Sequence, residues 1–252
     1  MVISKILFRA TFVKYDGERK AGIVMESIIF EGNLKNGQPI HMRKLTAGQL
    51  PEILSLQQEV IEALEVKERL QPLTEEEFRF ILDGNGEMLG VYADGELIAW
   101  RAMLVPDNDH EGLGRDVGVP EEEISKVIYQ EISAVSPKWR GFSLQTLMGL
   151  VLMERVDSDK HRYVCSTVMP GNIPSLKDKF RHGLEVRALK EKYGGKLRYV
   201  FFKDLKTQEH QRTESREIPM DDIAGQQALL GAGWAGTALV GDGNGWFVRY
   251  ER

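Results

Sequence analysis

The chain has 252 residues, a formal net charge of -5 at pH 7 and a single cysteine. This length and an ordinary apolar fraction are typical of a globular protein with one large domain, or one domain with an appendage. Because the lysines and arginines are dispersed and outnumbered by acidic residues, we expect no nucleic-acid partner. No apolar run approaches the ~20 residues that span a bilayer, and charged residues interrupt the apolar N-terminal run. We therefore predict a soluble, cytoplasmic protein that binds no membrane.

Residues 3–33 have the pattern of β-structure. Two strand-like segments, residues 6–13 and 22–30, flank a turn signal at residues 15–18. A polar stretch with glycine at residues 34–39 predicts a domain boundary, and a short strand follows at residues 41–45.

Two amphipathic helices are predicted next. Thr46 can cap a helix whose apolar residues keep helical spacing through residues 50–64. The second helix begins with a capping box formed by Thr74 and Glu77, and it ends at Gly84.

A hairpin and a long acidic connection follow. Asp94-Gly95 is a strong turn signal between apolar segments at residues 88–93 and 96–104. Residues 106–126 are acidic and admit two interpretations: a substrate-gating loop that attracts a cationic amine, or a solvated connection with a short capped helix. The second is favoured. His110 lies among these acidic residues without the spacing of metal ligands, so we expect no metal site.

A basic corner after the strand Val127–Val135 is the strongest functional signal. The corner contains Lys138 and Arg140, followed by Gly141 and by Ser143 at the start of an apolar-striped helix. A helix N-terminus carries partial positive charge and unpaired N–H groups, and glycine lets the backbone approach a ligand closely. The corner therefore suits a phosphate or pyrophosphate group, although many such corners bind nothing.

Downstream elements alternate strand and helix. A strand at residues 161–168 leads to Asn172, which is placed to cap a helix that ends at Gly183. Strands are predicted at residues 184–189 and 197–202. Cys165, in the first of these strands, is interpreted as a buried hydrophobe rather than a catalytic thiol, because no histidine or carboxylate is patterned with it.

Residues 206–217 are charged and turn-like, and order is predicted to resume with a helix at residues 223–230 and a hairpin around residues 241–245. Residues 231–236 match G-x-G-x-x-G, but a helix precedes this match and a strand follows it. The dinucleotide-binding fingerprint requires the opposite order, so we interpret the match as a chance occurrence.

This order of elements over residues 39–206 resembles the GNAT superfamily of N-acetyltransferases. The segment from Lys138 to Ser143 is similar to the family's pyrophosphate loop, (Arg/Gln)-x-x-Gly-x-(Gly/Ala), and Val135-Ser136-Pro137 resembles the V-x-P exit from its fourth strand. Asn172-Ile173-Pro174-Ser175, with Gly183-Leu184 after it, resembles the family's N-x-x-(A/S)…G-(F/L) segment. The run from Tyr193 to Tyr199 resembles a bacterial subgroup of the family.

The resemblance implies acetyl-CoA as co-substrate and an amine of a small molecule or peptide as acceptor. The strand edge around Ala134 and Val135 would hydrogen-bond the pantetheine arm, and Asn172 would either reach that arm or only cap its helix, with Ser175 completing the motif. Trp139 would pack beside the pyrophosphate loop, and direct contact with adenine is the less favoured alternative. The residues implied to hold CoA are Ala134, Val135, Lys138, Trp139, Arg140, Gly141, Phe142, Ser143, Leu144, Asn172 and Ser175.

Two departures from the family pattern concern the chemistry. Lys138 and Ser143 replace the usual loop residues without threatening phosphate binding, but Lys179 stands where many members carry a tyrosine that protonates the departing thiolate. The general acid is therefore not assigned. Glu131 is the available carboxylate on the strand before the loop, and it is our candidate for the base that deprotonates the amine, against the alternative of a solvated rim carboxylate.

The predicted class is α/β (α+β), with a GNAT-like mixed central β-sheet flanked by helices. We divide the chain into an N-terminal β-hairpin segment (residues 1–38), the acetyltransferase-like domain (39–206) and a C-terminal helix plus β-hairpin (207–252). The two terminal segments are expected to pair into a small β-rich module. A non-catalytic acyl-CoA-binding or protein-interaction module is the alternative function, and the sequence leaves a homodimer open.

Overall fold

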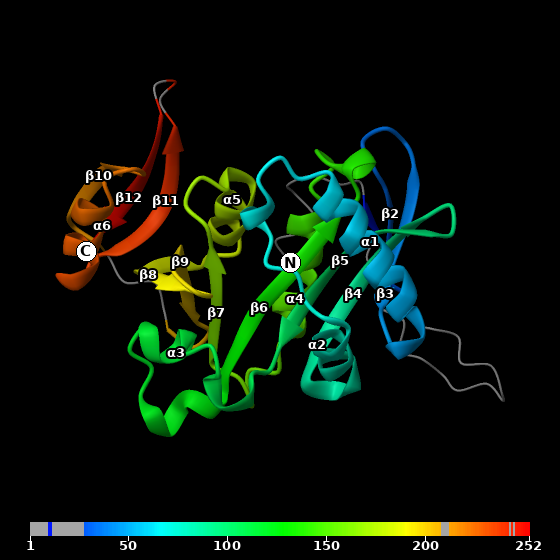
Figure 1. Ribbon diagram of the computed structural model, residues 1–252, viewed down its shortest axis with the longest axis horizontal. Coiled ribbons are helices and arrows are strands. Elements are labelled where there is room, and N and C mark those ends of the chain that lie inside the picture. The colour runs from blue at the N-terminus through cyan, green and yellow to red at the C-terminus, as the bar shows by residue number, and fades with distance from the viewer. Residues whose placement is uncertain (1–9, 12–27, 208–211, 242, 244) are drawn as a thin grey trace. The chain divides into compact units, whose positions relative to one another are not determined.

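The computed structural model describes residues 10–11, 28–207, 212–241, 243 and 245–252. It forms two compact units: unit 1 contains Met1–Leu104 and Glu131–Arg155, and unit 2 contains Val105–Gln130 and Val156–Arg252. The first residues of strand β6 (Val127–Val135) belong to unit 2, and its last residues belong to unit 1. Each unit has a mostly antiparallel sheet with helices packed on it (Figure 1).

Unit 1 holds its strands in the order β1-β2-β3-β4-β5-β6, with antiparallel ladders from β1 to β5. Helices α1 and α4 pack on β5, and α4 also packs on β4. Besides β6, its elements are β1 (Ala10–Thr11), β2 (Ile28–Asn33), β3 (Pro39–Lys44), α1 (Leu50–Glu62), α2 (Glu75–Phe80), β4 (Gly86–Ala93), β5 (Glu96–Leu104) and α4 (Leu144–Arg155).

The helix starts and the hairpin of unit 1 are confirmed. Thr46 caps a 3₁₀ turn, Ala47–Gln49, that leads directly into α1. At α2 the capping box is complete, because the Glu77 N–H donates to Thr74 Oγ1 (3.2 Å) and the Thr74 N–H donates to Glu77 Oε2 (2.6 Å). Asp94 and Gly95 both have positive φ, 50° and 82°, as the tight turn between β4 and β5 requires.

The terminal module stays a prediction. The expected turn at residues 15–18, and most of the strands predicted at residues 6–13 and 22–30, lie outside the described residues. Within the described part, β1 pairs with β2, with Ala10 opposite Gly32.

Unit 2 holds its strands in the order β6-β7-β9-β8-β11-β12-β10. The β6–β7 ladder is parallel and the other ladders are antiparallel, so the predicted mixed sheet flanked by helices is confirmed. Besides β6, its elements are α3 (Leu113–Asp116), β7 (Tyr163–Val168), α5 (Ile173–Arg181), β8 (Glu185–Lys192), β9 (Lys196–Asp204), β10 (Ser215–Pro219), α6 (Ile223–Gly231), β11 (Ala235–Gly241) and β12 (Trp246–Glu251).

Strand β10 corrects one expectation. Residues 206–217 read as a charged turn, yet Ser215–Pro219 pairs with β12 over its whole length. Charged side chains suit this strand because it lies at the end of the strand order, where most of its residues are exposed. The expected context of the G-x-G-x-x-G match is confirmed, because α6 precedes it and β11 follows it. Among the helices of the described ranges, none is both long and apolar enough to cross a bilayer.

An ion pair in unit 2 gives a pH-dependent prediction. Burial raises the pKa of Asp204, but hydrogen bonds from Arg162 and from the Lys206 N–H, together with the charge of Arg162, outweigh burial and lower that pKa to about 2. The pair therefore stabilises the folded protein above the unfolded pKa of about 4, and this stabilisation is lost as the pH falls from about 4 to 2. We expect Asp204→Asn to lower the free energy of unfolding by about 2 kcal/mol at pH 7, as measured by urea denaturation.

The matched control is Glu217→Gln, which removes the carboxylate of a half-exposed pair with Arg249 and should cost about 0.5 kcal/mol or less. The difference between wild type and Asp204→Asn should shrink as the pH is lowered toward 2. A difference that stays constant between pH 7 and pH 3 would contradict the assigned pKa.

Candidate functional site

The basic corner of unit 1 contains two residues in the left-handed backbone region. After β6, a 3₁₀ turn (Pro137–Trp139) leads to Gly141 and Ser143, whose φ angles are 84° and 59°. A Cβ at Gly141 would meet nothing within 4 Å, so glycine is favoured there by its backbone angle and not by lack of space. Ser143 adopts the left-handed region at a cost of roughly 1–2 kcal/mol, which is typical of functional turns.

The first turn of α4 presents N–H groups at this corner. The Leu147 N–H donates to the Ser143 carbonyl (3.0 Å), so the Ser143 carbonyl accepts the first hydrogen bond of the helix. The N–H groups of Leu144 and Gln145 precede that bond, in the first turn, where N–H groups have no acceptor within the helix. Lys138 and Arg140 are exposed beside them. The corner thus joins helix N–H groups with two cations, an arrangement that favours an anion.

Neighbouring elements of unit 1 hold the corner in place. The Ser136 N–H donates to the Ile98 carbonyl of β5 (2.9 Å), and Ser136 Oγ donates to Glu59 of α1 (2.9 Å). Arg101, a buried residue of β5, donates from Nη1 to the Gln145 carbonyl in the first turn of α4 (3.0 Å). Trp139 and Phe142 lie against each other across the loop, with ring centroids 6.1 Å apart. Trp139 therefore packs beside the loop.

Glu131 lies on the same strand as the corner. Along β6, Ile132 and Ala134 are buried, whereas Glu131, Ser133 and Val135 are half-buried on the other face. Glu131 and Val135 are four residues apart, roughly 13 Å along a strand. Of the predicted site residues, those from Glu131 to Leu144 are thus gathered on one strand, one turn and one helix start of unit 1.

The other predicted residues, Asn172 and Ser175, belong to unit 2. Asn172 caps α5, because its Oδ1 accepts from the Ser175 N–H (3.4 Å). The capping role that the sequence left open is therefore present. Whether Asn172 also reaches pantetheine stays a prediction.

Lys179 is buried in unit 2, where it contacts β6. Its Nζ donates to Gln130 Oε1 (2.9 Å), and the Gln130 carbonyl accepts from Ser166 Oγ of β7 (2.8 Å). The parallel β6–β7 ladder pairs the first three residues of each strand and ends at Tyr129 opposite Cys165. The Ser166 hydroxyl thus bonds Gln130 just past the end of this ladder.

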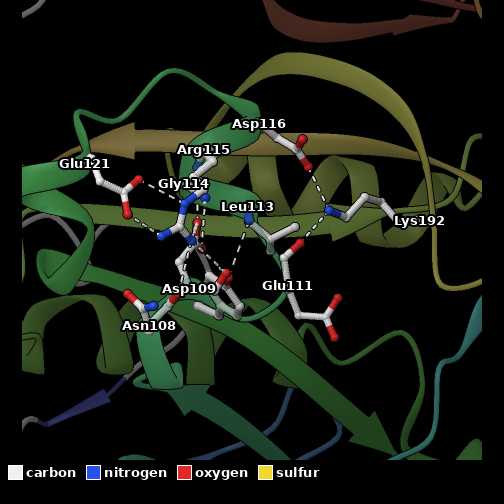
Figure 2. Close-up of polar contacts among 10 residues, drawn as sticks. Asn108, Asp109, Glu111, Leu113, Gly114, Arg115, Asp116, Glu121 and Lys192 are labelled. Carbon is white, nitrogen blue, oxygen red and sulfur yellow. Dashed lines mark hydrogen bonds and ion pairs between the residues drawn. The ribbon is translucent and has the colours of Figure 1, made fainter.

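The acidic connection is organised around a buried carboxylate (Figure 2). Asp109 accepts hydrogen bonds from the N–H groups of Gly114 (3.0 Å) and Arg115 (3.1 Å) and from the Tyr129 hydroxyl. The Arg115 guanidinium lies 3.5 Å from Asp109 and also pairs with Glu121. Burial, followed by the bond to Asp109, raises the pKa of Tyr129, so this phenol stays protonated.

The next carboxylate of the connection is also paired. Asp116 accepts from Lys190 (2.9 Å) and Lys192 (2.8 Å) of β8. Burial raises the pKa of Asp116, but these two lysines outweigh it and lower the pKa. Lys192 also donates to the Glu111 carbonyl (Figure 2). These ion pairs use the charges of Asp109 and Asp116 within the fold, which disfavours a loop that offers this charge to a cationic amine. The burial of Asp109 also differs from the solvated connection that the sequence favoured.

Cys165 is fully buried in β7, and burial raises the pKa of its thiol. The interpretation as a small buried hydrophobe is supported, since a reactive cysteine needs exposure and a low pKa. Within the described ranges, no group of three or more His, Cys, Asp or Glu side chains is arranged to hold a metal ion.

Comparison with known proteins identifies the fold. No family model and no curated protein sequence matches the chain. Among solved structures, a GNAT-family acetyltransferase from Listeria monocytogenes 4b F2365 is 15% identical, with a TM-score of 0.52 over 69% of this chain and 99% of that one. A proposed acetyltransferase from Acinetobacter baylyi ADP1 is 15% identical, with a TM-score of 0.51 over 69% and 98%.

A third similar structure is YncA from Salmonella typhimurium, a proposed acetyltransferase solved with its cofactor acetyl-CoA. It is 10% identical, with a TM-score of 0.51 over 67% of this chain and 95% of that one. At these identities the likeness establishes the fold alone: the chain has the fold of the GNAT acetyltransferases.

Proposed function

We propose, on the premise of this GNAT fold, that the chain transfers an acetyl group from acetyl-CoA to the amine of a small molecule or peptide. The observation that carries the proposal is the corner from Lys138 to Leu144, where the first turn of α4 and two exposed cations favour a diphosphate. The similar structure of YncA contains acetyl-CoA, which supports the same ligand here.

The chain's own residues supply three parts of the reaction. The N–H groups of the first turn of α4 bind the pyrophosphate, and the edge of β6 around Ala134 and Val135 positions the pantetheine arm. Glu131 accepts a proton from the acceptor amine. The amine nitrogen then forms a bond to the thioester carbonyl carbon, the carbon–sulfur bond breaks, and CoA leaves with its sulfur reprotonated.

The decisive experiment separates ligand binding from chemistry. Isothermal calorimetry with CoA tests the corner, and release of free thiol from acetyl-CoA over a panel of amines tests the transfer. We expect CoA binding and thiol release with at least one amine. The absence of any heat with CoA would refute the proposal.

Glu131→Gln tests the proposed base. We expect kcat/KM for the amine to fall about 100-fold, because positioned acid–base groups contribute factors of that order, while the Kd for CoA is unchanged. The loss should be largest at neutral pH and smaller at high pH, where more of the amine is already deprotonated. Ser133→Ala, a change on the same face of β6, is the control and should leave both constants within about twofold. Unchanged turnover of Glu131→Gln would remove Glu131 from the mechanism.

One observation favours the alternative of a non-catalytic acyl-CoA-binding module. Lys179, at the helix position where the family resemblance implies a tyrosine acid, is buried and hydrogen-bonded to Gln130. Tight CoA binding without thiol release from any amine would identify this module.

A further inference from the structure

Unit 2 contains the same arrangement of elements twice. Strand β7, helix α5 and the hairpin β8–β9 form repeat 1 (residues 163–204), and β10, α6 and the hairpin β11–β12 form repeat 2 (residues 215–251, orange to red in Figure 1). In both repeats the last strand is central, because β9 lies between β7 and β8, and β12 lies between β10 and β11.

The two repeats also share their strand register. A residue before the hairpin turn of repeat 1 corresponds to the residue 50 positions later in repeat 2, and a residue after the turn to the residue 49 positions later. In repeat 1, Val168 pairs with Tyr199. The corresponding pair in repeat 2 is Ile218 with Val248, which is the pair observed. The same offsets convert Ala188 opposite Val200 into Ala238 opposite Arg249. Even the β-bulges coincide, between residues 186 and 188 and between residues 236 and 238.

The helices begin and end alike. Asn172 and Asp222 each cap their helix by accepting from the N–H three residues later, and Gly183 and Gly233, with φ of 72° and 84°, end the two helices. Backbone hydrogen bonds also correspond at the 50-residue offset. The N–H of residue 172 donates to the carbonyl of residue 169, as that of residue 222 does to residue 219, and the N–H of residue 184 donates to the carbonyl of residue 179, as that of residue 234 does to residue 229. The positions with identical residues are Ile173 and Ile223, Gly183 and Gly233, Ala188 and Ala238, and Leu189 and Leu239.

The repeats meet as the two halves of a symmetric dimer do. Strands β8 and β11 pair antiparallel with Val186 opposite Gly236, which are equivalent positions 50 residues apart. The other contacts are reciprocal, because α5 packs on β11 and α6 packs on β8. An interface in which equivalent residues face each other is the isologous type that a twofold axis produces.

The residues at the contact between repeat 1 and repeat 2 nevertheless differ between the two repeats, so the contact joins two unlike surfaces. A Cβ at Gly236 would lie 2.9 Å from the Val186 Cβ and 3.0 Å from Val248 Cγ1, so glycine on one strand makes room for valine on the other. Buried Gln226 of α6 accepts from the hydroxyls of Tyr199 (2.7 Å) and Tyr250 (2.9 Å), one from each repeat. The equivalent position in α5 is the buried apolar Leu176.

We infer that residues 215–251 are a second copy of the unit formed by residues 163–204, and that this copy is the resident partner of the β8 edge. The interaction surface of β8 and α5 therefore recognises a β-α-β-β unit of the same kind, supplied by the same chain. This inference does not depend on the proposed activity.

Repeat 2 lacks the buried polar residues that α5 carries. Asp178, Lys179 and His182 are buried polar residues in repeat 1, and the positions 50 residues later are Ala228, Leu229 and Ala232. The polar contact with β6 made by Lys179 thus has no counterpart in α6. Repeat 2 serves as a docking unit.

A cysteine pair in the full-length chain tests the contact. In Val186→Cys/Gly236→Cys, the two thiols should form a disulfide on mild oxidation, because their Cβ atoms are placed closer than the 3.5–4.5 Å of a disulfide and need only a small shift. The buried native Cys165 does not compete. Val186→Cys/Leu239→Cys is the matched control, with its second cysteine displaced by roughly 10 Å along β11.

Each outcome decides the inference. We expect Val186→Cys/Gly236→Cys to run as a monomer on non-reducing gels. After denaturation it should have one free thiol per chain, that of Cys165, because the other two form the disulfide, whereas the control should retain three free thiols. A disulfide between two chains would show that repeat 2 docks on a neighbouring molecule, and three free thiols would show that the edges do not pair. Either result would overturn the inference.

Hydrogen exchange of the wild-type chain provides a measurement that needs no variant. Backbone amides around Val186 should exchange as slowly as those in the centre of β9, because β8 is flanked on both sides. Fast exchange in β8, as expected of an open edge strand, would overturn the inference independently of the cysteine pair.

Discussion

Replacing Asp109 with alanine is expected to lower the free energy of unfolding by about 3–5 kcal/mol, the cost of breaking a buried charge network. The carboxylate accepts hydrogen bonds from the Tyr129 hydroxyl and from the N–H groups of Gly114 and Arg115. Its removal leaves these donors without that acceptor, and the side chain of Asp109 is fully buried. Because a domain has only about 5–15 kcal/mol of stability, this loss is severe.

Urea denaturation measures the loss, and two variants locate its cause. Asp107→Ala removes an exposed carboxylate from the same connection and should change stability by about 0.5 kcal/mol or less. Tyr129→Phe removes one of the three donors and should cost about 1–2 kcal/mol. A loss for Asp109→Ala no larger than that for Asp107→Ala would show that the carboxylate does not organise the connection.

The double variant Lys138→Ala/Arg140→Ala is expected to raise the Kd for CoA about 100-fold. Each exposed cation would contribute a charge-assisted contact to the pyrophosphate worth roughly 1.4 kcal/mol, or a factor of ten. The salt dependence of CoA binding should weaken in the same variant, since exposed charges are screened by salt.

Calorimetry at low and high salt measures both effects. The matched control is Lys35→Ala/Lys44→Ala, which removes two exposed positive charges elsewhere in unit 1 and should leave the Kd within about twofold. Equal affinities in the two double variants would mean that net charge, and not the corner, governs binding. Gly141, with its φ of 84°, is a second probe of the same corner, because alanine there strains the turn.

Local signals predicted much of the fold. The Thr74–Glu77 capping box, the Asp94-Gly95 turn and the Asn172 cap are each determined by a few neighbouring residues. The strand Val127–Val135 was predicted with the bounds that the structure shows. These elements depend on residue type and spacing, which a sequence displays directly.

The central role of Asp109 could not be predicted. It is one of several acidic residues in residues 106–126, and pattern alone does not show which of them is buried. Its burial depends on Tyr129, twenty positions later on β6, and on the N–H groups of α3. The same holds for Lys179, whose partner Gln130 lies on β6.

The repeat escaped sequence analysis for a different reason. Only a few positions are identical at the 50-residue offset, because a strand or helix face needs apolar residues of suitable size and not particular ones. The conserved features are the register, the bulges and the caps, which become visible once the strands are paired. The glycines at the two helix ends, Gly183 and Gly233, were the accessible signal.

The candidate site was predicted in part. The sequence indicated the corner from the glycine, the two cations and the helix start, and the structure adds the left-handed conformation of Ser143 and the support from Ser136 and Arg101. Those supports come from β5 and α1, distant in sequence, so spacing could not reveal them.

The burial of Cys165 has a practical consequence for assays. A folded chain offers no accessible sulfhydryl in its described part, so a colorimetric reagent added to a turnover mixture would register only liberated coenzyme. Without coenzyme, the same reagent would react with the Cys165 thiol only after strand β7 unfolds, so its signal would then report denaturation of the protein.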